Sequence, residues 1–262
     1  MIVTVLGSSG GRIPGRALTS FVVNSDTLLD VGGTSGALDE KAQVKIKRVL
    51  ISHSHLDHIY SLAFVLETAL SHNKSVEIIS SKKVLDIIAS DFLNDRLWPD
   101  FTKIKTKDNK PVALLRAILP GRKTRLGEYT VEAIEVNHAV PAVGFIISDA
   151  EGTLFYTGDM GPTPVVWKKI RTNPKKIDAL LTELSFPNKM EALALLSGHL
   201  TPDMLENGML GAGIVDIPVY LSHIKPAYVK TIIEELDKLP RKNIHVLKDG
   251  SCFRVKSRGR SD

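Results

Sequence analysis

Residues 49–59 have the sequence Val49-Leu50-Ile51-Ser52-His53-Ser54-His55-Leu56-Asp57-His58-Ile59, an apolar run that ends in the pattern H-x-H-x-D-H. At the end of an extended strand, residues i and i+2 point the same way, so His53 and His55 can bind one metal ion together. Asp57 and His58, at the turn into a helix, can then face a second ion. Neutral imidazole and carboxylate groups suit zinc and its first-row neighbours.

Other polar residues of the same types lie directly after strand-like segments elsewhere in the chain. These residues and the segments before them are Asp30 after 27–29, His138 after 131–136, Asp159 after 153–158 and His223 after 217–222. Strands that deliver polar side chains at their ends are a common way for a rigid scaffold to build a site. A single such histidine is more often structural, but the whole set indicates a shared metal site.

Composition limits the classes of protein that the chain can belong to. Its 262 residues allow one larger domain or two small ones, and 43% apolar content allows a sizeable core. The N-terminal segment is expected to form a strand rather than a signal peptide, and no apolar run is long enough to span a membrane. The single cysteine, Cys252, favours a reducing compartment, so we expect a cytoplasmic protein. The net charge of +5 is compatible with an anionic substrate but is not diagnostic of nucleic acid.

The order of elements predicts an α+β protein. The expected strands are 2–6, 20–24, 27–30, 48–52, 76–80, 112–119, 129–136, 143–148, 153–156, 179–181, 219–221 and 243–246. The expected helices are 59–71, 82–93, 163–170, 202–210 and 226–236, and Thr201 is expected to cap the fourth of them. Hairpin-rich runs with interspersed helices favour two sheets packed between helix layers, with the metals along one edge.

The combined pattern resembles the metallo-β-lactamase superfamily over nearly the whole chain, from about Met1 to His245. The resemblance rests on H-x-H-x-D-H, the lone His138, Thr157-Gly158-Asp159 and Ser222-His223-Ile224. Five segments narrow it to the class II 3′,5′-cyclic-nucleotide phosphodiesterases: 53–62, 97–101, 183–186, 198–202 and 223–226. Ala63 and Phe64 depart from that signature, since plain aliphatic residues are expected there. The resemblance implies a single domain over residues 1–262 with a four-layer αβ/βα sandwich of two mixed sheets.

The resemblance also implies a role for each ligand. One divalent metal ion would be bound by His53, His55 and His138, and the other by Asp57, His58 and His223. Asp159 would bridge the two ions, which are expected to be zinc, with manganese or iron as alternatives. A hydroxide between them would attack the phosphodiester of a cyclic nucleotide such as cAMP or cGMP, giving a 5′-nucleotide.

Further residues are expected to support this reaction. Asp30 would accept a hydrogen bond from a ligand imidazole. Phosphodiester hydrolysis must protonate a poor leaving group, so we assign His199 as the general acid, oriented by Glu183, and count Asp57 with them as catalytic. The substrate contacts are expected at Gly10, Gly11 and Arg12, in a glycine-rich loop that fits no nucleotide-binding motif, and at Trp98.

Two alternative functions stay open. The tRNA 3′-end-processing endonucleases share the ligand set, and their substrate would be nucleic acid. Leu56 replaces the glycine that commonly precedes the motif aspartate in those enzymes, and their long protruding arm is not evident. The third hypothesis is a non-catalytic binding module, which the presence of all seven ligands disfavours. The sequence leaves the oligomeric state open, and a homodimer is compatible with it.

Overall fold

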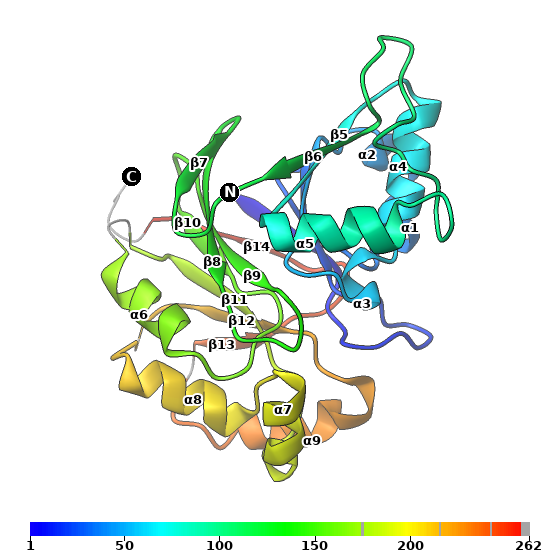
Figure 1. Ribbon diagram of the computed structural model, residues 1–262. Coiled ribbons are helices and arrows are strands. Elements are labelled where there is room, and N and C mark those ends of the chain that lie inside the picture. The colour runs from blue at the N-terminus through cyan, green and yellow to red at the C-terminus, as the bar shows by residue number, and fades with distance from the viewer. Residues whose placement is uncertain (174–175, 215, 242, 258–262) are drawn as a thin grey trace.

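Two mixed sheets of seven strands each form the centre of the molecule (Figure 1). The computed structural model describes residues 1–173, 176–214, 216–241 and 243–257. The first sheet has the order β14-β1-β2-β3-β4-β5-β6 and the second β13-β12-β11-β10-β9-β8-β7. The strands are β1 (Ile2–Gly7), β2 (Ser20–Val23), β3 (Thr27–Val31), β4 (Arg48–Leu50), β5 (Val76–Ser80), β6 (Ala113–Ala117), β7 (Lys123–Leu126), β8 (Tyr129–Glu135), β9 (Val143–Ser148), β10 (Thr153–Tyr156), β11 (Ala179–Glu183), β12 (Val219–Ser222), β13 (Ile244–Val246) and β14 (Cys252–Arg254).

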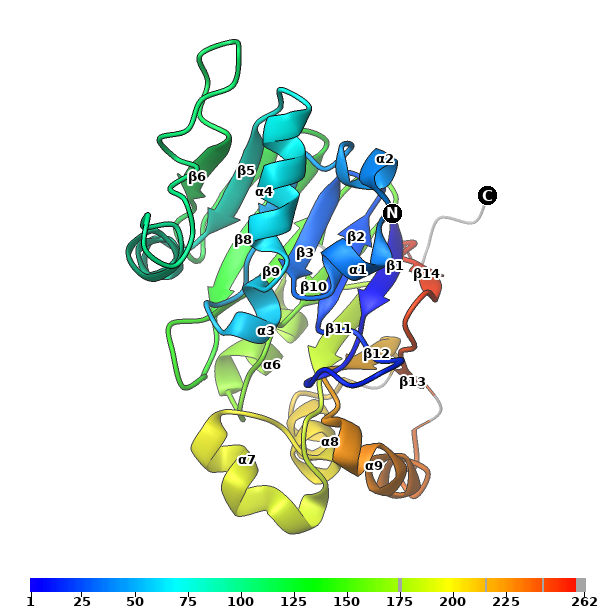
Figure 2. The ribbon, with the colours of Figure 1, turned by 90° about the vertical axis from the view of Figure 1, so that its right-hand side faces the viewer.

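Helices cover the outer face of each sheet, and Figure 2 shows α4 lying across the first sheet. The helices are α1 (Thr34–Ala37), α2 (Glu40–Gln43), α3 (Leu56–Ile59), α4 (Leu62–Ser71), α5 (Lys82–Ile87), the π-helical η1 (Ile88–Phe92), α6 (Pro164–Thr172), the 3₁₀ turn η2 (Asn188–Met190), α7 (Glu191–Ser197), α8 (Pro202–Gly211), the 3₁₀ turn η3 (Pro226–Tyr228) and α9 (Val229–Leu236). No helix among the described residues is both long enough and apolar enough to cross a membrane.

Three layers of buried side chains separate these four layers of backbone. One core lies between the two sheets and contains Phe21 and Phe145. A second joins the first sheet to α4, α5 and η1, and a third joins the second sheet to α6, α8 and α9. The predicted four-layer αβ/βα sandwich of an α+β protein is therefore confirmed.

The two sheets share one plan of connectivity, although no internal sequence repeat is evident. Each begins with antiparallel strands and continues with parallel ones: β3 to β6 are parallel in the first sheet, and β10 to β13 in the second. The carboxyl ends of parallel neighbours lie at the same edge of a sheet. Side chains that follow β4, β10, β11 and β12 are therefore carried to sheet edges.

The helix that the sequence predicts from Ile59 to Ser71 is divided in the structure. The helix α3 already begins at Leu56, within the histidine motif, and α4 starts at Leu62. Ser61 lies between the two helices and is fixed to the end of β3. Its backbone N–H donates to Val31 O (2.9 Å), and its hydroxyl donates to Gly32 O (2.9 Å). These bonds hold the motif against the end of β3.

Other boundaries also differ from the prediction. The helix expected over residues 82–93 changes to π-helical geometry at Ile88, and the one expected at Pro226 begins with a 3₁₀ turn. The strands β7 and β14 and the helices α1, α2 and α7 were not predicted. Each of these is short. The strand β7, Lys-Thr-Arg-Leu, has little apolar character and lies at the edge of its sheet, where β8 is its one partner among the described strands. The predicted cap of α8 is confirmed, since the Thr201 hydroxyl accepts from Met204 N.

Candidate metal centre

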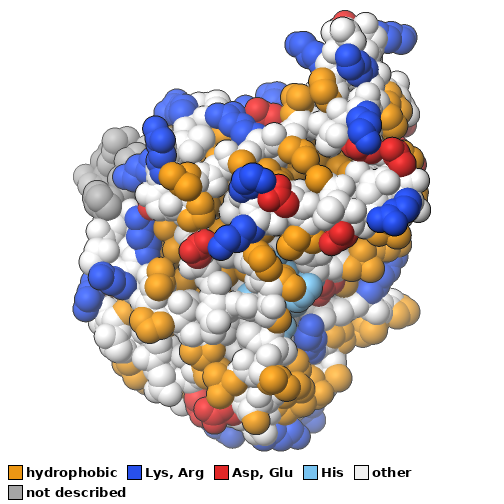
Figure 3. All heavy atoms as spheres, viewed as in Figure 1, with side chains coloured by type: hydrophobic (Ala, Val, Ile, Leu, Met, Phe, Trp, Pro, Cys, Tyr) orange, Lys and Arg blue, Asp and Glu red, His pale blue; other side chains and the backbone are white. Residues whose placement is uncertain are grey.

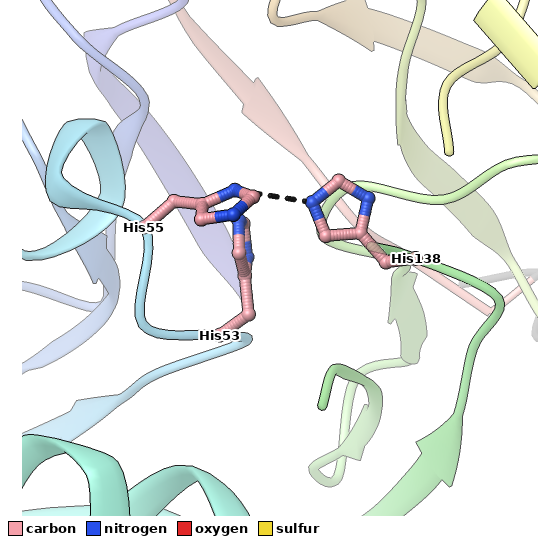
Figure 4. Close-up of side chains that lie close together, drawn as sticks. All are labelled: His53, His55 and His138. Atoms are coloured by element: carbon pink, nitrogen blue, oxygen red, sulfur yellow. Dashed lines mark hydrogen bonds between the residues drawn. The ribbon is translucent and has the colours of Figure 1, made fainter. Parts of the chain in front are cut away.

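The predicted ligands come from both sheets and meet at one edge of the sandwich. The histidine motif leaves β4 of the first sheet and enters α3. His138, Asp159 and His223 follow β8, β10 and β12 of the second sheet. Figure 4 shows His53 and His55 on one segment, facing His138 on another. Histidine side chains are visible at the surface near the middle of Figure 3, among hydrophobic side chains, so the site is open to solvent.

The first group consists of His53, His55 and His138. One ring nitrogen from each lies within 4.8 Å of the others. His138 Nε2 is 3.2 Å from His55 Nδ1, the contact drawn in Figure 4. His53 is fully buried, whereas His55 and His138 are half-buried. Three imidazoles converging in this way can hold one metal ion.

The second group consists of Asp57, His58 and His223, whose ligand atoms also lie within 4.8 Å of one another. His223 Nε2 is 3.5 Å from Asp57 Oδ2. The His223 backbone has a left-handed conformation (φ 60°), which is unusual for histidine and turns its side chain back toward the site after β12. This mixed carboxylate and imidazole set can hold a second ion.

Asp159 lies between the two groups. Its Oδ2 is 3.2 Å from His58 Nε2, 3.1 Å from His223 Nε2 and 3.9 Å from His53 Nε2. Its Oδ1 is buried and has no hydrogen-bond partner within the described part of the chain. A buried carboxylate with one oxygen unsatisfied and the other surrounded by imidazoles is an arrangement that cations would complete.

The imidazoles are oriented by bonds to their Nδ1 atoms. His58 Nδ1 lies 2.7 Å from Asp30 Oδ2, His138 Nδ1 lies 2.8 Å from Gly198 O, and His53 Nδ1 lies 3.0 Å from Ser52 Oγ. The Nε2 atoms of His53, His58 and His223 are buried without a partner among the described residues. With Nδ1 carrying the proton, each Nε2 presents its lone pair to the site, as a metal ligand must.

Asp30 is the centre of the network behind these ligands. It is fully buried with a left-handed backbone (φ 49°), and its carboxylate accepts from Ser52 N (2.7 Å), Ser52 Oγ (2.7 Å), His58 Nδ1 and Tyr156 Oη. Tyr156 belongs to the second sheet, so this network also ties the two sheets together. Asp30 therefore lies directly behind the imidazole of His58, one of the candidate ligands.

The electrostatics keep most of the imidazoles neutral. Burial lowers the pKa of His53 and His223 well below its usual value, and that of His55 and His138 to a lesser degree. Burial also acts on His58, but Asp159 and Asp30 outweigh it and raise the pKa of His58.

Burial raises the pKa of Asp159, but the neighbouring His223 and His58 outweigh it and hold the pKa well below its usual value. The lowered pKa favours the ionised form of the Asp159 carboxylate. Neutral imidazoles around a carboxylate are the donors that divalent transition metals require, so these residues fit such ions.

His199 lies beside the second group, where its ring stacks on His223 with centroids 5.4 Å apart. Its Nδ1 is 3.1 Å from Ser185 Oγ and 3.5 Å from Glu183 Oε1, while Ser185 Oγ donates to Glu183 Oε2 (2.7 Å). Burial lowers the pKa of His199, but Glu183 outweighs it, and the net pKa is raised. With Nδ1 held by this pair, Nε2 is the ring nitrogen left to act on a substrate.

The expected substrate contacts do not form one cluster. Gly10 lies against His223: a Cβ there would be 2.4 Å from the His223 carbonyl oxygen, and its N–H already donates to Ile224 O (3.2 Å). Gly10 thus packs against a ligand, whereas Arg12 lies farther out on an exposed loop. Trp98 packs against Phe64 (centroids 5.9 Å apart).

Several residues of the site were not identified from the sequence. Four groups contact candidate ligands, Asp30 or His199, yet none belongs to a residue type that marks a metal site: Ser52, Tyr156, Ser185 and the Gly198 carbonyl. Ser52 is adjacent to the motif and could have been suspected from that position. Tyr156 contacts Asp30 across the sheets, whereas Ser185 contacts Glu183 and His199 within the half of the molecule that contains the second sheet. Only their three-dimensional neighbours identify both residues.

Comparisons with known proteins agree with this geometry. The profile of the beta-lactamase superfamily domain matches residues 25–214. A Yersinia pestis protein named "Probable 3',5'-cyclic-nucleotide phosphodiesterase" is 26% identical over 291 aligned positions, which cover 90% of this chain and 83% of that protein. A Pyrococcus horikoshii "Ribonuclease Z" is 27% identical over 254 positions, 88% of this chain and 80% of that protein.

The fold is shared with a solved structure, unliganded yeast PDE1, with a TM-score of 0.80 and 17% identity over 96% of this chain and 98% of that one. The family match covers most of the chain, and the relatives align over nearly all of it. Together with the two-sheet sandwich, they show that this chain belongs to the metallo-β-lactamase superfamily.

Proposed function

We propose that the protein is a metal-dependent phosphodiesterase that hydrolyses 3′,5′-cyclic nucleotides such as cAMP and cGMP to 5′-nucleotides. The observation that carries the proposal is the convergence of seven side chains from both sheets, Asp159 among them, with the His199–Ser185–Glu183 group beside them. The relative from Yersinia pestis adds support for the substrate class. Because the two sheets supply one site, we also propose that residues 1–262 act as one hydrolase domain.

The ligand assignment follows the two groups. We propose that His53, His55 and His138 hold one ion, that Asp57, His58 and His223 hold the other, and that Asp159 bridges them. Zinc suits this nitrogen-rich set best, with manganese or iron as alternatives. When bound, the ions would lower the pKa of a water molecule and neutralise charge on the phosphate. Asp30 holds the Nδ1 proton of His58 and so keeps its Nε2 available as a ligand.

His199 is proposed to supply the proton that the leaving alkoxide needs. Its Nδ1–H donates to Ser185 Oγ, and Ser185 Oγ–H donates to Glu183, so the imidazole is fixed with Nε2–H free. Leu200 N donates to the other Glu183 oxygen (2.7 Å), which holds the carboxylate in place. Burial lowers the pKa of His199, but Glu183 outweighs it and the net shift is upward, which favours the protonated imidazole that a general acid needs.

Arg12 and Trp98 are proposed to contact the nucleobase. They lie at the two ends of a continuous row of side chains that also contains Tyr60 and Phe64. The Arg12 guanidinium is 5.7 Å from the Tyr60 ring centroid, Tyr60 is 6.1 Å from Phe64, and Phe64 is 5.9 Å from Trp98. Tyr60 lies two residues after His58 in the chain, and bases stack well on aromatic rings. Tyr60→Ala should raise KM for a cyclic nucleotide while KM for bis(p-nitrophenyl) phosphate, which lacks a base, changes little. An equal rise in both would contradict the assignment of a base contact.

One experiment tests the reaction itself. The metal-reconstituted enzyme would be assayed in parallel with cAMP, cGMP, bis(p-nitrophenyl) phosphate and pre-tRNA, with metal-stripped enzyme as the control. We expect a 5′-nucleotide as the product of at least one cyclic nucleotide. If only bis(p-nitrophenyl) phosphate is hydrolysed, the assignment as a phosphodiesterase stands, but the proposal that cyclic nucleotides are the substrates is wrong.

The second candidate function is a tRNA 3′-end-processing endonuclease, which the ribonuclease Z relative favours. The loop between η1 and β6 also projects from the first sheet and carries Lys103, Lys105, Lys107 and Lys110 (Figures 1 and 2). Cleavage of pre-tRNA without turnover of cAMP or cGMP would transfer the assignment to this function.

A further inference from the structure

A second cavity, separate from the metal centre, lies between α6 and α8. Its volume is about 690 Å³, which is within the range of small-molecule sites. The walls are formed by Pro162, Pro164, Val165 and Trp167 on one side and by Met204, Gly208 and Ala212 on the other. The cavity is therefore mainly apolar.

The charged side chains that line this cavity are all positive. Lys168 and Arg171, on successive turns of α6, are part of its lining, and the described lining residues include no carboxylate. Both cations are exposed, and the described chain offers neither of them an ion pair. The neighbouring Lys169, in contrast, is bound to Glu132 (2.5 Å). The cations at the cavity are thus free to receive an anion.

The backbone of α8 keeps the cavity open. At Gly208 a Cβ would lie 2.4 Å from the Trp167 indole, so glycine lets the ring pack directly against the helix. At Gly211 a Cβ would meet no atom within 4 Å, so that position borders empty space. An indole wall with open space beside it accommodates a flat or branched apolar group.

We propose that this cavity binds a small amphipathic anion, an aromatic or aliphatic body that carries one carboxylate or sulfonate. The apolar body would lie against Trp167 and Met204, and the anionic group would be bound by Lys168 and Arg171. Charge complementarity and burial of apolar surface then act on the same molecule. The site is adjacent to functional segments, because Pro162 follows Asp159 on one loop and α8 follows His199.

The probe for the test is 8-anilino-1-naphthalenesulfonate, which combines an aromatic body with a sulfonate. The chain has two tryptophans, so Trp98→Phe leaves Trp167 as the only indole that can transfer energy to the bound probe. We expect saturable binding with one probe per chain and quenching of Trp167. An aliphatic carboxylate such as decanoate should displace the probe, while decanol, which lacks the charge, should displace it less well.

Variants of the cavity decide whether the probe binds there. Arg171→Ala should weaken binding of the probe about tenfold, as expected for loss of a charge-assisted contact. The control is Lys123→Ala, which removes a cation on the edge strand β7 and should leave probe binding unchanged. Gly211→Leu should abolish binding by filling the space and should raise Tm, because leucine is a better helix former than glycine. Since that variant is expected to fold well, loss of binding cannot be assigned to unfolding.

Three results would overturn the proposal. Absence of saturable binding would reject the site, and equal binding by Gly211→Leu and the parent would show that the probe adheres elsewhere. Light scattering that shows a dimer, together with probe binding that falls as the protein concentration rises, would show that a second copy of the chain covers the cavity. None of these results depends on the proposed phosphodiesterase activity.

Discussion

The N-terminal and C-terminal halves of the molecule share one sheet topology but contribute to the candidate metal centre in different ways. The first sheet delivers His53, His55, Asp57 and His58 from one segment between β4 and α3. The second delivers His138, Asp159 and His223 singly, from three strand ends far apart in sequence. A contiguous motif needs only local structure to bring its ligands together, whereas the dispersed set depends on correct pairing of the second sheet. Within the candidate site, Asp159 and the Asp30–Tyr156 contact are among the places where polar groups of the two halves meet.

The largest expected effect is at Asp159, which contacts imidazoles from both halves. Asp159→Ala should lower turnover by about 10⁴-fold, since several kcal/mol of charge stabilisation would be lost. It should also reduce bound metal from two ions per chain, measured by elemental analysis after reconstitution. Asp86→Ala, an exposed carboxylate on α5 paired with Lys82, is the matched control and should change neither quantity. Near-normal turnover of Asp159→Ala would show that it does not bridge.

His199 comes from the C-terminal half alone and is proposed to donate a proton rather than bind metal. His199→Ala should retain both metals and lose about 10³-fold in turnover of a cyclic nucleotide, the middle of the range for a positioned acid. The loss should shrink for bis(p-nitrophenyl) phosphate, whose leaving group needs no proton. Equal losses on both substrates with the metals intact would exclude the acid role.

The network around Asp30 links the two halves and holds His58, so weakening it should lower the affinity of the second group for its proposed metal ion. Asp30→Asn should reduce metal affinity by about 10–100-fold, the usual effect of losing the partner of a ligand imidazole. Tyr156→Phe removes one of the four bonds to Asp30 and should have a smaller effect in the same direction. Competition with a chelator measures both affinities. Unchanged affinity in Asp30→Asn would show that the His58 ring does not need its partner.

The smallest effect expected concerns the contact between the N-terminal loop and His223. Gly10→Ala would place a Cβ 2.4 Å from the His223 carbonyl oxygen and should destabilise the fold by about 1–3 kcal/mol, as overpacking does. Gly36→Ala is the matched control, because a Cβ there meets nothing within 4 Å. Urea denaturation of both variants gives the comparison. Equal stability would mean that the loop and His223 shift apart at little cost.

The sequence by itself determined the class of fold and the set of candidate metal ligands. The spacing of His53, His55, Asp57 and His58 fixes their directions through local backbone geometry, and apolar runs before His138, Asp159 and His223 mark them as strand ends. The order of strands and helices predicted two sheets between helix layers for the same reason. Each element is recognised from the periodic pattern of apolar residues, which is a property of neighbouring residues. Each of these patterns extends over only a few neighbouring residues, so it can be recognised in the sequence alone.

Only the tertiary structure decided which distant groups meet. Tyr156 reaches Asp30 across the sheets, Ser185 joins Glu183 to His199, and the Gly198 carbonyl accepts from His138 Nδ1. The short edge strands β7 and β14 likewise exist because a partner strand supplies their hydrogen bonds. The cavity between α6 and α8 depends on how two helices far apart in sequence pack. Such contacts are set by long-range packing, which leaves no periodic trace along the chain.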